Sequence, residues 1–477
     1  MNNKFLFTFL LLCSIHYGLF ATGDAKITIR LTHSNMGNKQ LVLNTVADYI
    51  EHNVGAIEQC GLTDKNGSYT FHISGIKTYH TFNLQVIGLT YRAGYIAAGD
   101  DVIIEYSGDG GKGIQANYTS YRGKGSAALI AAGKFVSIPV VVFQQFNAKT
   151  DCSKLDLDTL CSAAQEACRE NLSMLDFYRA GMSDAIYQQL QADQYGAVYS
   201  VLVSFLTKNI GKFTNVDALA SLMAQLYQAD PKLKVRALLQ SKDYLGYRFA
   251  FASLMNAMRR VDNADSYLGI CNELIKLDHG LLREKTLMKF LYRNNAIAKS
   301  QNPDLVYSSA LSNIKTPGYR KLVKELEMSR RAGAMAYDFS MPDSSGKVVK
   351  LSDFKGKVVI LDSWFTGCSS CILMARKIER DVLPQFKDNP SVVFVSICAD
   401  KIKSTWLQSL NSGEYTNKGS VDLYTDGIGL SHPFMKKYNY YGFPQLMLIG
   451  KDGHLLSSSM PRDGKGMVNM INHALRK

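Results

Sequence analysis

The sequence predicts a multidomain chain in three structured parts: a β-sandwich-like N-terminal domain, an α-helical middle domain and a C-terminal α/β domain. Its 477 residues are enough for about three domains. Polar and apolar residues alternate at 68–74 and at 81–86, as in strands with one buried face. Apolar residues three and four positions apart recur between about 151 and 333, which indicates helices. Further on, an apolar and β-branched run at 358–361 precedes a second stretch with helical spacing.

These changes of pattern set the predicted domain boundaries. We predict a signal peptide at 1–21, a β-rich domain at 22–150, a helical domain at 151–333 and an α/β domain at 334–477. Within the helical domain the spacing predicts helices at 185–206, 244–258, 267–277 and 281–292.

Composition and charge describe an ordinary globular protein. Hydrophobic residues make up 46% of the chain and charged residues 20%, which is enough apolar surface to bury a full core. The formal net charge of +13 is spread along the chain without a dense basic block. A solvated basic surface is therefore favoured, and no nucleic-acid partner is expected. The oligomeric state is left open.

The N-terminus reads as a secretory signal peptide. Lys4 precedes an apolar run at 5–20, and the small residue Ala21 follows it. The run is short for a membrane span and contains His16. Cys13 lacks the preceding small residue of a lipoprotein signal, so a lipid anchor there is not expected. We therefore expect the mature protein in the periplasm or cell envelope.

A C-x-x-C motif, Cys368 to Cys371, stands where the apolar strand turns into a helix. The first turn of a helix has unpaired N–H groups and the positive end of the macrodipole, which stabilise a thiolate. A lowered thiol pKa makes Cys368 a nucleophile near neutral pH. Cys371 lies one turn later on the same face, where it can attack a mixed disulfide and release the substrate.

The segment from about Ala336 to the C-terminus resembles the thioredoxin superfamily, in particular extracytoplasmic thiol–disulfide oxidoreductases of the TlpA/ResA type. The matching features are, in order, a hairpin at 336–357, Trp364 with the C-x-x-C motif, a strand at 392–398, Gly442-Phe443-Pro444, a strand at 445–449, a hairpin at 451–453 and a final helix at about 464–475. The resemblance implies a C-terminal α/β thioredoxin fold. Residues 94–106 and 121–126 resemble the N-terminal β-domain of some exported TlpA-like proteins.

The resemblance also implies roles for individual residues. Asp362 matches the buried acid that takes the proton of the resolving thiol, here Cys371, and burial should raise its pKa. Pro444 matches the cis-proline beside the active site, which turns the backbone of Phe443 toward the cysteines to pair with an extended peptide. Trp364, Phe443 and Pro444 are therefore predicted to contact the substrate.

Two departures from the family pattern affect the chemistry. Ser369 and Ser370 stand between the cysteines and add neither a charge nor a histidine, so we expect a mild reductant. Met374 replaces the glutamate that many members carry three residues after the second cysteine. Asp362 is then the one nearby acid that the sequence makes evident.

The cysteines could also serve a zinc site, a peroxidase or a structural disulfide. A zinc site needs four ligands, and the sequence has no second C-x-x-C or H-x-x-x-H motif, so no metal is expected. A peroxidase of the peroxiredoxin kind is a lesser alternative, because Leu361 occupies the proline position of its Pro-x-x-x-Thr-x-x-Cys pattern. Cys161 and Cys168 are expected to face a core, with a disulfide involving Cys152 as the open alternative. Cys398 is also expected in a core.

The favoured function is thiol–disulfide exchange, in the direction of reduction, on disulfides of exported proteins. It needs no cofactor beyond a redox-active disulfide between Cys368 and Cys371, and the resemblance implies a membrane thiol carrier as electron donor. The alternative is a binding or scaffolding protein of the cell envelope with an accessory thioredoxin-like domain, because the first two domains make up more than half of the chain.

Overall fold

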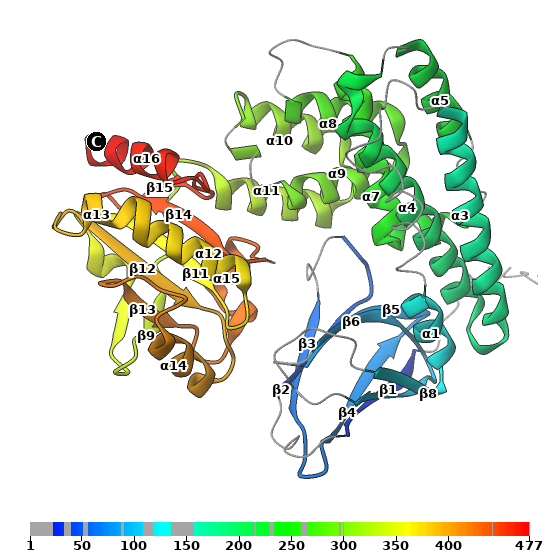
Figure 1. The fold of residues 1–477 in the computed structure, drawn as a ribbon, viewed down its shortest axis with the longest axis horizontal. Coiled ribbons are helices and arrows are strands. Elements are labelled where there is room, and N and C mark those ends of the chain that lie inside the picture. Colours follow the sequence, from blue (N-terminus) through cyan, green and yellow to red (C-terminus); the bar gives the residue numbers. More distant parts are fainter. Residues whose placement is uncertain are drawn as a thin grey trace, which may run out of the picture.

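The structure, a computed structural model, describes residues 22–32, 40–50, 56–86, 90–107, 118–134, 157–213, 216–228, 233–259, 266–294, 297–298, 300–440 and 442–476. The predicted signal peptide and Cys152 lie outside these ranges. Figure 1 shows a β-rich part, a helical part and an α/β part, with the β-rich and α/β parts both next to the helices. None of the helices in the described ranges combines the length and the apolar character that crossing a bilayer requires.

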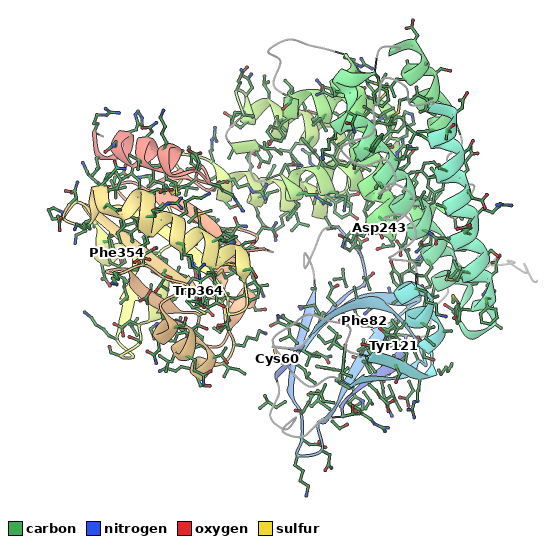
Figure 2. All side chains as sticks on the ribbon, viewed as in Figure 1. Cys60, Phe82, Tyr121, Asp243, Phe354 and Trp364 are labelled. Atoms are coloured by element: carbon green, nitrogen blue, oxygen red, sulfur yellow. A yellow bond between two sulfur atoms is a disulfide. The ribbon has the colours of Figure 1, made fainter. Side chains whose placement is uncertain are left out.

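The β-rich part, called the β-region here, contains two four-stranded sheets with the orders β4-β1-β7-β8 and β3-β2-β5-β6. Its strands are β1 (Gly23–Leu31), β2 (Gln40–Val46), β3 (Ile57–Leu62), β4 (Ser68–Ile76), β5 (Tyr79–Val86), β6 (Thr90–Ala97), β7 (Asp101–Ser107) and β8 (Tyr118–Lys124), followed by helix α1 (Ser126–Lys134). Ile27 and Phe71 of one sheet and Leu43 and Phe82 of the other belong to one buried core. Phe82 lies among these strands in Figure 2. The sheets therefore pack face to face, as in a β-sandwich.

The helical part, called the helical region, follows. Its helices are α3 (Leu157–Phe177), α4 (Asp184–Lys208), α5 (Val216–Gln228), α6 (Val235–Gln240), α7 (Lys242–Met258), α8 (Ser266–Leu277), α9 (Gly280–Arg293), α10 (Pro303–Asn313) and α11 (Pro317–Arg330). The four helices predicted from apolar spacing correspond to α4, α7, α8 and α9 and are confirmed. Cys161 and Cys168 are free thiols buried in the core of this region, as predicted.

Buried tyrosines join the β-region to the helices. Tyr79 of β5 donates a hydrogen bond to Gln189 of α4 at 2.6 Å, and Tyr95 of β6 donates to the carboxylate of Asp193. Burial raises the pKa of Asp193 to about 7. A second contact uses Asp48, whose carboxylate accepts hydrogen bonds from Lys285 of α9 and Tyr319 of α11. The β-region is thus tied to the helices at two places.

The C-terminal part has a five-stranded sheet with the order β13-β12-β11-β14-β15. Strands β11, β12 and β13 are parallel, and β14 and β15 are antiparallel to their neighbours. The strands are β9 (Ser340–Pro342), β10 (Val348–Lys350), β11 (Val358–Trp364), β12 (Val392–Cys398), β13 (Val421–Tyr424), β14 (Gln445–Ile449) and β15 (Leu455–Ser457), and the helices are α12 (Ser369–Lys377), α13 (Leu383–Phe386), α14 (Lys403–Ser412), α15 (Pro433–Lys437) and α16 (Gly464–Arg476). This is a thioredoxin fold, as the resemblance predicts, and we call this part the thioredoxin-like domain.

Strand β11 is the centre of this domain because both of its faces are covered. All seven of its residues are buried. Successive side chains point to opposite sides of the sheet. Ile360 packs with Met374 of α12 in one core, and Leu361 packs with Phe434 of α15 in the other. A strand buried on both faces therefore fixes the end at which the chain leaves the sheet.

The crossing of α4 and α7 supplies a test of this packing. A Cβ atom at Gly196 would lie 2.1 Å from the backbone nitrogen of Tyr244. Because the clash is with backbone, no change of side-chain rotamer can relieve it. We expect Gly196→Ala to lower the free energy of unfolding by roughly 1–3 kcal/mol or more. Thermal unfolding followed by far-UV circular dichroism measures the change. Gly318→Ala in α11 is the matched control, because a Cβ there meets nothing within 4 Å. Equal melting temperatures for the two variants would contradict the close crossing.

Candidate functional site

The two cysteines lie at the junction of β11 and α12. After Trp364 the chain leaves the sheet through a turn in which Gly367 has φ +90°, a conformation that glycine adopts without strain. Cys368 is the N-cap residue of α12, with an extended backbone. The backbone N–H of Cys371 donates to Cys368 Sγ at 3.1 Å. The sulfur of Cys368 thus occupies the position of a helix-capping acceptor.

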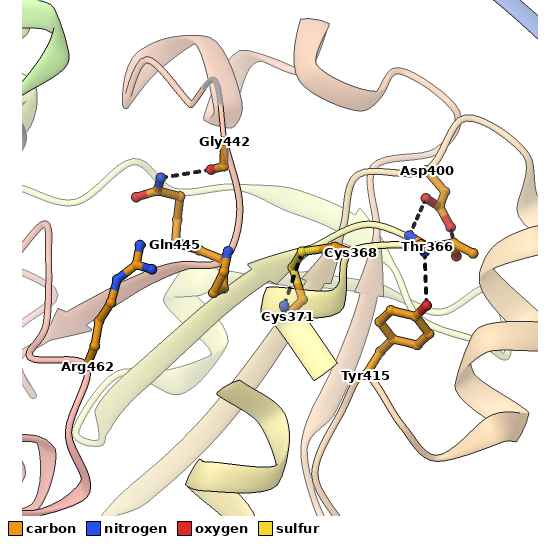
Figure 3. Close-up of a disulfide and its surroundings, with 10 residues drawn as sticks. Thr366, Cys368, Cys371, Asp400, Tyr415, Gly442, Gln445 and Arg462 are labelled. Carbon is orange, nitrogen blue, oxygen red and sulfur yellow. Dashed lines mark hydrogen bonds between the residues drawn. A yellow bond between two sulfur atoms is a disulfide. The ribbon is translucent and has the colours of Figure 1, made fainter. Parts of the chain in front are cut away.

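The two sulfur atoms form a disulfide, drawn in Figure 3, with an S–S distance of 2.01 Å and a Cα–Cα distance of 5.3 Å. Cys368 keeps 7% of its surface exposed, whereas Cys371 is fully buried. The residue nearer the sheet is therefore the more accessible of the two. The division between an attacking Cys368 and a resolving Cys371 stays a prediction.

Asp362 lies on β11 among apolar residues. Burial raises the pKa of its carboxyl group to about 8. Its Oδ1 atom has no hydrogen-bond partner among the residues that the structure describes. Because side chains alternate along a strand, Asp362 points to the same face as Ile360, which packs against α12. The acid thus lies on the side of the sheet that is covered by the cysteine-bearing helix.

A loop from the other end of the domain lies beside the disulfide. The Phe443–Pro444 peptide bond is cis, as the resemblance predicts. The ring of Phe443 contacts that of Phe365 at a centroid distance of 5.5 Å, and both rings pack against the cluster that contains the two cysteines. Arg462 donates to the carbonyl oxygen of Pro444 at 3.3 Å. Figure 3 shows the Arg462 side chain on the same side of the disulfide as Gly442 and Gln445.

The position of Trp364 corrects its predicted role. The sequence places Trp364 among the substrate contacts, but the side chain is fully buried. Its ring stacks on Tyr415 at 4.8 Å, and its Nε1 donates to Ser396 Oγ at 2.7 Å. A side chain without exposed surface supports the turn before Cys368 and does not present itself to a substrate.

Two residues that sequence reasoning missed hold this turn. The carboxylate of Asp400 accepts hydrogen bonds from the backbone N–H of Thr366 at 2.9 Å and from its hydroxyl at 2.5 Å. The hydroxyl of Tyr415 accepts from the backbone N–H of Gly367 at 2.9 Å (Figure 3). Asp362 is therefore not the one acid near the cysteines. Asp400 follows the end of β12, and the carboxyl ends of adjacent parallel strands share one sheet edge, which is the signal that could have found it.

The residues that could bind a metal lie as follows. Within the described ranges, no three histidine, cysteine, aspartate or glutamate side chains gather as ligands. His432 Nδ1 accepts from the backbone of Phe434 at 3.2 Å, and Cys398 is a buried free thiol, as predicted for that residue.

A buried strand, a C-x-x-C disulfide at a helix start and a neighbouring cis-proline loop together define a thioredoxin-like thiol site. Residues 332–456 match the model of the AhpC/TSA family. The thiol-disulfide oxidoreductase ResA of Bacillus cereus is 26% identical over 152 residues, which are 32% of this chain and 80% of that protein. The thioredoxin-like protein YneN of Bacillus subtilis is 28% identical over 134 residues, 27% of this chain and 70% of that protein. A solved thiol:disulfide interchange protein from a Bacteroides species is 25% identical with a TM-score of 0.27, over 31% of this chain and 93% of that one.

The family match and the ResA relative are consistent with an oxidoreductase. The family match begins at residue 332, so the β-region and the helical region lie outside it.

The raised pKa of Asp362 predicts a pH-dependent stability. The folded domain keeps this proton up to about pH 8, whereas an unfolded aspartate loses it near pH 4. The free energy of unfolding should therefore fall between pH 4 and pH 8, by about 1.4 kcal/mol for each pKa unit of the shift. Asp362→Asn should remove this fall and be the more stable protein at pH 9.

Urea unfolding at pH 5, 7 and 9 measures the effect. Both tryptophans of the chain, Trp364 and Trp406, are buried in the thioredoxin-like domain, so their fluorescence reports on it alone. Parallel pH curves for the wild type and Asp362→Asn would contradict the assignment.

Proposed function

We propose that this chain is a thiol–disulfide oxidoreductase that reduces disulfides of exported proteins through Cys368 and Cys371. The observation that carries the proposal is the Cys368–Cys371 disulfide at the first turn of α12, in which Cys368 is the less buried of the two residues. The names of the relatives support the same reaction class. The short dipeptide between the cysteines contains no charge, which favours a reductant.

The proposed cycle begins with the reduced protein. The thiolate of Cys368 attacks one sulfur of the substrate disulfide, and the other sulfur leaves as a thiolate. Asp362 in its ionised form then accepts the proton of the Cys371 thiol, and the Cys371 thiolate attacks Cys368 Sγ. This step breaks the mixed disulfide, releases the second substrate sulfur and leaves the Cys368–Cys371 disulfide. With a pKa of about 8, Asp362 is mostly protonated at neutral pH, so the ionised acceptor is the minor form and the carboxyl group must release its proton to water before the next cycle.

Substrate and electron supply complete the proposal. Phe443 packs against the cluster that contains both cysteines, and we assign to Phe443 and Pro444 the backbone pairing with an extended substrate segment. Two electrons and two protons from a membrane thiol carrier reduce the disulfide again. The protein needs no cofactor apart from its own cysteine pair. The proposed site of action is the periplasm or cell envelope, after removal of residues 1–21.

Within the proposal, the chain divides into the β-rich domain at 22–150, the helical domain at 151–333 and the thioredoxin-like domain at 334–477. The first two domains contribute no redox group to the cycle.

Cysteine variants test the reaction. With dithiothreitol as the reductant, the wild type should accelerate insulin reduction, and Cys368→Ala should abolish the acceleration because the attacking thiolate is gone. Cys371→Ala should accumulate mixed disulfides with substrate proteins, which mass spectrometry identifies. Cys271→Ala is the matched control, since Cys271 is a buried free thiol of the helical region. If all four proteins perform equally, the binding or scaffolding alternative replaces the enzyme.

The direction of the reaction has its own readout. A reduction potential near the strongly oxidising value of about −120 mV would make the protein an oxidase. Hydrogen peroxide as the oxidising substrate tests the peroxidase alternative, which the AhpC/TSA match keeps in view. Peroxide consumption that survives Cys371→Ala would favour it.

The role of Asp362 is tested by separating the two chemical steps. Asp362→Asn should form the mixed disulfide at the wild-type rate and resolve it about 10²-fold more slowly, because the proton acceptor for Cys371 is missing. Quenched-flow trapping of the mixed disulfide measures both rates. An unchanged resolution rate would leave Asp362 without a role in proton transfer.

A further inference from the structure

The β-region contacts the thioredoxin-like domain through strand β3. Glu58 accepts hydrogen bonds from Lys401 Nζ at 2.5 Å and from Ser431 Oγ at 3.0 Å. Lys401 Nζ also lies 3.0 Å from Cys60 Sγ, and Figure 2 shows Cys60 on the edge of the β-region that faces the other domain. The Lys401 and Glu58 side chains are only 9% and 19% exposed, so the ion pair is largely removed from water. We call Glu58, Lys401 and Ser431 the latch.

The latch adjoins the loop that holds the redox site. Lys401 directly follows Asp400, whose carboxylate binds Thr366, and Thr366 is two residues before Cys368. Figure 1 shows that α12 runs away from the other two parts, with its cysteine-bearing first turn at the near end. Strand β3 therefore contacts the loop that restrains the turn before Cys368.

Strand β3 is firmly held in this position. It pairs with β2 along its whole length. The Gln59 side chain donates to the backbone of His72 in β4 at 2.8 Å. The ring of Tyr69 covers Gly61 so closely that a Cβ there would lie 2.4 Å from it. These contacts thus fix the position of β3, which is the edge strand of its sheet.

The latch closes a ring of contacts among the three parts. The β-region is tied to the helices through Asp48 and Tyr95. The helical region continues from α11 into a linker in which the N–H of Gly333 donates to the carbonyl of Leu455 in β15 at 2.7 Å. Strand β3 then returns to the thioredoxin-like domain at Lys401. With three joints, each part restricts the position of the other two.

We infer that the latch makes β3 one wall of the approach to Cys368, so that Glu58 and Lys401 determine which disulfides reach it. The inference rests on the proposed function. Small disulfides and disulfides in slender, extended segments pass the wall, and those in bulky proteins are hindered. A glutamate and a lysine suit this role, because removing one partner leaves the other charge poorly solvated and opens the contact.

Charge reversal tests the wall. Glu58→Lys places two cations in the latch and should raise kcat/KM for insulin several-fold, with no change for the small aromatic disulfide 5,5′-dithiobis(2-nitrobenzoic acid). The double variant Glu58→Lys with Lys401→Glu restores opposite charges and should return to the wild-type ratio of the two rates. Glu105→Gln is the matched control, since Glu105 is a comparably buried ion-pair partner of Arg122 within the β-region. An unchanged ratio in Glu58→Lys, or equal changes for both substrates, would overturn the inference.

The contact itself is tested without reference to redox activity. A carbodiimide should join Glu58 to Lys401 through an amide in the wild type, and peptide mass mapping should find the linked pair. Glu58→Gln should lose this product, because its amide cannot be activated by the carbodiimide. If the wild type gives no linked peptide, the inference fails while the proposed function stands. If the wild type fails to reduce the small disulfide, the proposed function fails instead.

Discussion

The burial of strand β11 is the constraint on which the thioredoxin-like domain depends. Helices cover both faces of this strand, and its residues therefore have one register and one exit from the sheet. The exit turn places Cys368 at the start of α12, where a sulfur atom takes the position of a capping oxygen. The same burial surrounds Asp362 with apolar side chains and raises its pKa. One packing requirement thus fixes the position of the sulfur atoms and the protonation of the acid on the same strand.

Polar contacts, in contrast, fix the fine geometry around the disulfide. Asp400 accepts a hydrogen bond from the backbone N–H of Thr366, and Tyr415 accepts one from the backbone N–H of Gly367. Trp364 lies beneath them as a stacked, fully buried support. Hydrogen bonds are directional and hydrophobic burial is not, so apolar packing alone would leave the turn free to slide. The turn therefore combines an apolar base with polar restraints.

The sequence predicted those helices, strands and site residues that are marked by a pattern of neighbouring residues. Helical spacing located α4, α7, α8 and α9, and the strands at 392–398 and 445–449 agree with β12 and β14 residue by residue. The cysteine pair and the cis-proline were found because short motifs mark them. The restraint from Asp400 on Thr366 spans 34 residues, and the latch between Glu58 and Lys401 spans 343. No local pattern encodes such pairs.

The prediction that Trp364 contacts the substrate failed for the same reason, because its burial depends on residues distant in the sequence. A motif gives the residue type beside the cysteines, but exposure is decided by residues elsewhere in the chain, here Tyr415 and Ser396.

Asp400 and Lys401 are adjacent in the chain but serve different contacts. One contact lies within the thioredoxin-like domain, and the other joins this domain to the β-region. Asp400 turns inward to the loop before Cys368, and Lys401 turns outward to Glu58 of the β-region. Both residues lie in the short loop between β12 and α14, so one loop holds both contacts. The contact with the β-region and the restraint on the turn before Cys368 therefore come from two consecutive residues of one loop.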